Sequence, residues 1–122
     1  MKYSVAITGW GEDALVFLED RDGSFLIFFD ETAPKELTEI AVLHTRSELL
    51  ADPEPGDTVI LCEKTYQITA VGEEALQTLR SMGHCTFYFK GANVPERHGC
   101  IMLEGIAPDS ADIVCGGLLE IY

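Results

Sequence analysis

The side chains best suited to chemistry surround one histidine. His44 ends an apolar run, residues 41–43, and the polar stretch 45–48 follows it with two hydroxyls, a guanidinium and a carboxylate. Because the unperturbed pKa of histidine lies near neutrality, a well-positioned neutral ring nitrogen can act as a nucleophile or carry a proton. The chain has only three histidines, so its chemistry depends largely on whether His44 carries a group.

A neutral imidazole nitrogen can attack phosphorus, and the phosphoryl group it receives then needs donors nearby. Arg46 would lie on the same face as His44 if the strand continued, and its guanidinium could bind phosphate oxygens in a fork. Thr45 and Ser47 could add donors, and Glu48 or a backbone carbonyl could fix the ring tautomer. The alternative is a half-buried histidine with a purely structural role.

The other two histidines have plainer surroundings. His84 follows Gly83, where it could hydrogen-bond to the last carbonyls of a helix or contact His44 and help to orient its ring. His98 lies in a polar loop. No His-x-His or His-x-x-x-His spacing occurs, and neither a Gly-x-Ser-x-Gly motif nor a phosphate loop is present. We therefore expect no metal and no cofactor.

The elements that must position His44 are mostly short strands. Alternating or apolar runs are separated by turns at 20–23, 52–57 and 63–64, and Gly9-Trp10-Gly11 interrupts the first run. The predicted strands cover residues 3–8, 24–29, 40–44, 58–62, 65–71, 85–90, 99–104 and 118–122.

A helix is predicted around residues 73–82, with two glutamates in its first turn and Gly83 at its end. The fold class is therefore all-β. We expect a mainly antiparallel β-barrel or barrel-like sandwich in one domain, residues 1–122, with this short helix packed on it.

Charge and composition limit the partners. The net charge of -13 opposes nucleic-acid binding and disfavours anionic membranes, but it favours encounter with a basic protein. No apolar run approaches the ~20 residues of a membrane span, and the N-terminus has no pattern of a secretion signal. The four scattered cysteines fit a reducing cytoplasm.

Several segments together resemble a known family, the glucitol/sorbitol-specific IIA component of the bacterial phosphoenolpyruvate-dependent sugar phosphotransferase system. The match is collinear and covers most of the chain, although no single motif is diagnostic. The segments that carry it are residues 43–49, 55–57, 66–72, 79–86, 107–109 and 118–122.

The resemblance implies a cytoplasmic phosphoryl carrier with a small β-barrel-like fold. Such carriers accept a phosphoryl group on a histidine from the phosphocarrier protein HPr and pass it to a IIB component, while the membrane component transports the sugar. The family's phosphorylated histidine corresponds to His44. Some members have a second histidine two positions later, where this chain has Arg46. We expect His44 to lie at the surface, where both partners can reach it.

Two other functions remain open. The chain could be a non-catalytic regulatory or sugar-binding β-barrel module, for which changing His44 to Ala would leave function unaltered. It could instead be an interaction domain whose unpaired strand edges form a homodimer. A homodimer is compatible with all three functions, so it does not distinguish them.

Overall fold

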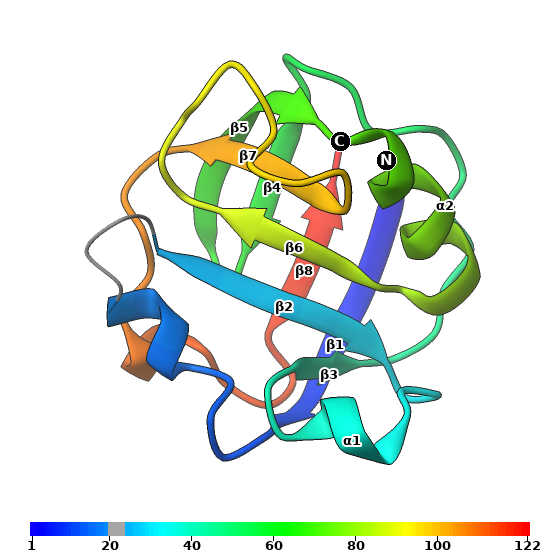
Figure 1. Cartoon of the computed structure of the whole chain (residues 1–122), viewed down its shortest axis with the longest axis vertical. Helices are drawn as coiled ribbons and strands as arrows, with labels where there is room; N and C mark the ends of the chain where they lie inside the picture. Colours follow the sequence, from blue (N-terminus) through cyan, green and yellow to red (C-terminus); the bar gives the residue numbers. More distant parts are fainter. Residues whose placement is uncertain (20–23) are drawn as a thin grey trace.

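Eight strands close into a barrel in the computed structural model, which describes residues 1–19 and 24–122 (Figure 1). Around the barrel the strands follow the order β1-β3-β2-β6-β7-β5-β4-β8. Their bounds are β1 Tyr3–Trp10, β2 Phe25–Asp30, β3 Val42–His44, β4 Thr58–Leu61, β5 Lys64–Val71, β6 Cys85–Tyr88, β7 Cys100–Glu104 and β8 Leu118–Ile121. The prediction of an all-β barrel is confirmed.

Most neighbouring strands are antiparallel, as predicted, but two pairs are parallel. β2 runs parallel to β3, and β6 runs parallel to β7. A parallel pair needs a crossover rather than a tight turn, and the short helix α1, Lys35–Thr38, lies in the crossover from β2 to β3. This crossover brings the C-terminal ends of β2 and β3 side by side.

The barrel interior is a packed core. Alternate side chains of β1 point inward, and Tyr3, Val5 and Ile7 are each at most 2% exposed. Small barrels of about eight strands are filled in this way, because their interiors are just wide enough for side chains. Other fully buried members of the core are Leu26, Phe28, Val42, Val59, Phe87, Ile101, Leu103, Leu119 and Ile121.

The predicted helix is confirmed as α2, Glu73–Met82, which packs beside β6 and β7. Glu73 and Glu74 occupy its first turn, where the positive end of the helix dipole favours them. Gly83 ends it in the left-handed conformation at φ 58°, and the Gly83 N–H donates to the Leu79 carbonyl. Two single-turn 3-10 helices, Val16–Glu19 and Ser110–Asp112, complete the described elements.

Three sequence predictions need comment. β1 continues through Gly9 and Trp10, because a shift of register between Ile7 and Gly9 absorbs the irregularity instead of ending the strand. The hairpin between β4 and β5 turns at Cys62 and Glu63, one residue earlier than predicted. The turn predicted at residues 20–23 lies outside the described residues.

None of the described helices is both long enough and apolar enough to span a bilayer.

Candidate functional site

The C-terminal ends of two parallel strands place a histidine next to an acid. His44 ends β3, Asp30 ends β2, and the two residues are paired in the strand register. Both follow apolar segments that are buried in the barrel wall. The crossover between these strands therefore places a polar pair at the ends of two otherwise apolar strands.

His44 is not at the surface, so the expectation of an accessible ring is wrong. Its side chain is 0% exposed. Nδ1 lies 2.7 Å from the Thr45 carbonyl oxygen, and Nε2 lies 2.8 Å from the Gly83 carbonyl oxygen. A carbonyl oxygen can only accept and a neutral imidazole donates only one N–H, so a neutral His44 ring hydrogen-bonds to just one of these two oxygens. Both nitrogens nevertheless face carbonyls, and neither presents a free lone pair to solvent.

The contact with Gly83 explains why this burial could not be predicted from the residues around His44. Gly83 caps α2, 39 residues beyond His44, and packs against both members of the polar pair. A Cβ built on Gly83 would come 2.6 Å from His44 Cε1 and 2.9 Å from Asp30 Cβ. The C-terminal corner of α2 therefore lies directly on the imidazole and covers it.

Asp30 is a site residue that the sequence analysis missed. Its side chain is 4% exposed. Oδ1 accepts hydrogen bonds from the Thr32 N–H, at 2.8 Å, and from the Thr32 hydroxyl. Arg46 Nε lies 3.5 Å from Oδ2. An acid at the end of a strongly apolar strand was the available signal, and it is the same signal that singled out His44.

Aromatic rings surround the pair inside the barrel. The Tyr3 ring meets His44 edge-on at 6.3 Å between centroids, and Phe28 lies 6.2 Å from it. Burial, and secondarily the negative charge of Asp30, raises the pKa of the Tyr3 hydroxyl above its ordinary value. Tyr3 is therefore a neutral wall residue at all physiological pH values.

The predicted phosphate-stabilising residues are only partly brought together. Arg46 is next to the pair through Asp30, but its own side chain is 58% exposed. The Thr45 hydroxyl accepts a hydrogen bond from the Ala6 N–H, so it serves the junction with β1. Ser47 and Glu48 are exposed, and neither has a described hydrogen bond to His44.

His84 is adjacent to the site through its backbone, although its ring faces elsewhere. Nδ1 lies 3.0 Å from the Phe28 carbonyl oxygen. The ring stacks on Phe29 at 3.9 Å and 10° between planes. Gly83, rather than His84, is the direct partner of His44.

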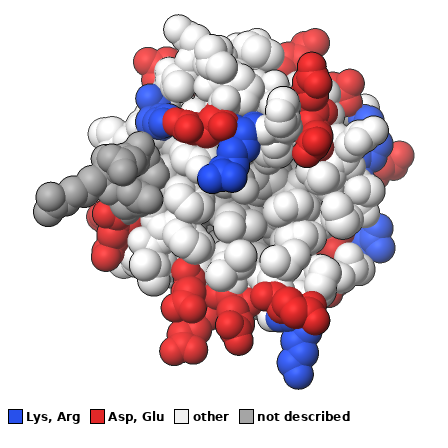
Figure 2. Space-filling view, in the orientation of Figure 1, with Lys and Arg blue, Asp and Glu red and all other residues white. Residues whose placement is uncertain are grey.

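Within the described residues no group of three or more His, Cys, Asp or Glu side chains is arranged to hold a metal ion. Figure 2 shows acidic side chains along the edges of one face, while the centre of that face, over β2 and β6, carries few charges.

Comparison with known proteins agrees with this architecture. Residues 2–117 match the family model of the PTS system glucitol/sorbitol-specific IIA component. This chain belongs to that family. The Escherichia coli (strain K12) PTS system glucitol/sorbitol-specific EIIA component is 37% identical over 118 residues, which is 97% of this chain and 92% of that protein. The Shigella flexneri protein of the same description shows the same identity and coverage.

A solved structure shares the barrel of this family member. The crystal structure of the PTS system IIA component from Enterococcus faecalis V583 superposes with a TM-score of 0.77 at 25% sequence identity. The superposition covers 97% of this chain and 98% of that one. The resemblance first recognised from scattered segments therefore extends over nearly the whole chain, in sequence and in fold.

Proposed function

We propose that residues 1–122 act as one IIA-type phosphocarrier domain in glucitol/sorbitol uptake. The domain takes a phosphoryl group from phospho-HPr and passes it to the IIB component of the sugar permease. It works in the cytoplasm, where members of the family meet HPr. The observation that carries this proposal is the family match over residues 2–117, supported by 37% identity to the E. coli component over 97% of the chain.

We further propose His44 as an acceptor. A lone pair on one ring nitrogen attacks phosphorus, the bond from phosphorus to the donor imidazole breaks, and the donor nitrogen is protonated. Since Gly83 and Thr45 carbonyls occupy both ring nitrogens of His44, the corner at Gly83 must first move away. Arg46, freed from Asp30, would then offset charge on the phosphoryl oxygens.

The burial of His44 also favours a second candidate, the non-catalytic regulatory or sugar-binding module. A fully enclosed imidazole with carbonyl partners is what a structural role requires. In that case the barrel would bind its partner without forming a phosphohistidine.

Phosphorylation in a reconstituted system separates the two candidates. The purified chain is incubated with phosphoenolpyruvate, enzyme I and HPr, and its intact mass is measured under neutral conditions. The carrier function predicts an acid-labile adduct of one phosphoryl group or more. With active enzyme I and HPr, an unmodified chain would contradict it and favour the module.

The His44→Gln variant tests the acceptor, and circular dichroism verifies that the variant is folded. His98→Gln is the matched control, because that histidine lies in an exposed loop. Passage of the phosphoryl group to the cognate IIB component completes the test of the carrier.

A further inference from the structure

The three histidines differ in how their ring nitrogens are occupied. Both nitrogens of His44 face carbonyls inside the core. His98 is exposed, and no described residue hydrogen-bonds to its ring. His84 is half-buried with one nitrogen held, and no described residue hydrogen-bonds to the other. Only His84 thus combines a fixed ring with an open nitrogen.

The surroundings of His84 fix both its orientation and its tautomer. The Phe28 carbonyl can only accept, so Nδ1 carries the hydrogen and donates it at 3.0 Å. In the neutral ring, Nε2 then carries the lone pair. Stacking on Phe29 holds the plane of the ring. A nucleophilic imidazole requires an acceptor that fixes its tautomer through one nitrogen and leaves the other nitrogen open. The Phe28 carbonyl oxygen is such an acceptor for His84.

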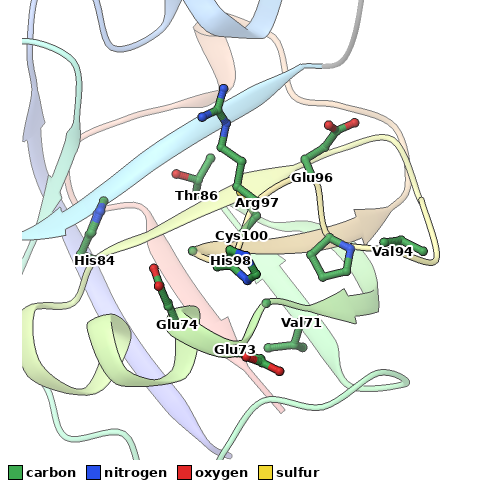
Figure 3. A pocket seen from close by; sticks show the side chains of 13 residues that line it. Val71, Glu73, Glu74, His84, Thr86, Val94, Glu96, Arg97, His98 and Cys100 are labelled. Atoms are coloured by element: carbon green, nitrogen blue, oxygen red, sulfur yellow. The ribbon is translucent and has the colours of Figure 1, made fainter.

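His84 lines an open pocket of about 860 Å³, which has ample room for a phosphoryl group. The pocket lies between the start of α2, the strand β6 and the loop that precedes β7 (Figure 3). In Figure 3, Thr86 lies between His84 and Arg97, the Arg97 side chain extends across β6 toward β2, and Glu74 extends toward the pocket from α2. An anion in this pocket would meet the Thr86 hydroxyl directly, and the exposed Arg97 side chain would have to turn inward to reach it.

The charges around the pocket partly offset one another. Glu73 and Glu74 on its rim oppose a phosphoryl dianion, whereas Lys90 pairs with and neutralises Glu96. Arg97 forms no ion pair with any described residue. Burial raises the pKa of the Cys100 thiol, and a backbone hydrogen bond and then the positive charge of Arg97 act against that rise. The guanidinium is thus within electrostatic range of the pocket wall.

We propose that His84 is a second phosphoryl-accepting residue, reached from solvent while His44 is still covered. The Nε2 lone pair attacks the phosphorus of the donor phosphohistidine. The bond between phosphorus and the donor nitrogen breaks, and that nitrogen takes up a proton from water. Nδ1–H of His84 keeps its hydrogen bond to Phe28, and Arg97 pairs with the phosphoryl oxygens. The inference rests on the proposed carrier function, because phospho-HPr is the donor.

Trypsin separates the three histidines into three peptides, which makes the test direct. Cleavage after lysine and arginine leaves His44 in residues 36–46, His84 in residues 81–90 and His98 in residues 98–122. The chain is phosphorylated with phosphoenolpyruvate, enzyme I and HPr, digested rapidly at neutral pH, and the phosphoryl group is located by fragmentation that preserves phosphohistidine. We expect it on residues 81–90.

Variants check that the label depends on the side chain. His84→Gln should lose the label in 81–90, and its amide can still donate to Phe28, so the fold is retained. His98→Gln should keep the label. Arg97→Gln should slow the labelling of 81–90 without moving it to another peptide.

The outcomes distinguish the inference from the carrier function. Label on 81–90, with or without label on 36–46, supports the inference. Label confined to 36–46 or to 98–122 overturns it and leaves phosphoryl carriage intact. No label on the parent chain, with active enzyme I and HPr, overturns both.

Discussion

At the scale of single residues, the polar pair of His44 and Asp30 is held by groups of unequal importance. Asp30 is almost fully enclosed and receives two hydrogen bonds from Thr32, whereas Arg46 approaches it from solvent at 3.5 Å. Hydrogen bonds to an enclosed, charged carboxylate contribute more to stability than an ion pair with a largely exposed side chain does.

We therefore expect Asp30→Ala to lower the free energy of unfolding by about 1–3 kcal/mol, since two hydrogen bonds to an enclosed, charged carboxylate are lost. Arg46→Ala, the matched control, should cost only about 0–1 kcal/mol, because that side chain is largely in water. Urea unfolding followed by circular dichroism measures both. Equal losses in the two variants would mean that the ion pair, rather than the buried hydrogen bonds, stabilises this corner.

Sequence reasoning located His44 on a strand correctly but not its exposure. The run at 41–44 shows that a strand is present, yet what covers its end is the cap of a helix 39 residues away. The contact between Gly83 and His44 could not be predicted for the same reason, because the two residues are far apart in the sequence. The local pattern identified Gly83 only as the end of a helix. His84 could be named as a candidate from its residue type alone. The Phe28 carbonyl that orients its ring belongs to β2, 56 residues away in the sequence, so the residues around His84 could not predict that contact.

At the scale of elements, the hairpin between β4 and β5 contains a strained turn. Cys62 and Glu63 adopt φ values of 48° and 73°, both in the left-handed region. Two such residues form the type I′ turn that matches strand twist, but this turn favours glycine or asparagine. The sequence predicted the hairpin from its flanking apolar runs and placed the turn one residue late, because neither Cys62 nor Glu63 carries the usual turn signal.

Replacing Glu63 with glycine should relieve this strain. The left-handed conformation costs an ordinary residue about 1–2 kcal/mol, and the flexibility of glycine offsets part of the gain. We expect Glu63→Gly to raise the free energy of unfolding by about 0.5–1 kcal/mol. Glu63→Ala, which keeps a Cβ at this exposed position, is the control and should change little. A destabilised Glu63→Gly would show that the side chain, and not the backbone, matters in this turn.

At the scale of the whole molecule, 21 acids outnumber 8 bases, so the few ion pairs that bridge distant segments are informative. Lys2 directly precedes β1 and Asp57 directly precedes β4, and Lys2 Nζ lies 2.6 Å from Asp57 Oδ2. Slight burial of Asp57 alone would raise its pKa, but hydrogen bonds from Lys2 and the Glu54 N–H outweigh this and lower it below 3.8.

This shift fixes the sign of a pH dependence. A carboxyl whose pKa is lower in the folded state stabilises that state above its unfolded pKa and loses the contribution as the pH falls through the folded value. The difference in unfolding free energy between the parent and Asp57→Asn should thus be constant from pH 7 to about 5 and should shrink below pH 3.8. Urea titrations across this range measure it. A difference that persists at pH 2 would assign the effect to something other than ionisation.

The closure of the barrel has a consequence for how the chain is made. β8 pairs on one side with β1, from Tyr3↔Ile121 to Ala6↔Leu118, and on the other side with β4. During synthesis β1 leaves the ribosome before the other strands of the barrel and β8 after them, so the edges of β1 and β4 stay open until β8 emerges. Open edges invite pairing with other chains, and contacts between segments far apart in sequence form slowly. The nascent protein therefore passes through a stage at which seven strands are present and the edges of β1 and β4 are unpaired. At this stage the chain is most prone to aggregate and most in need of chaperones.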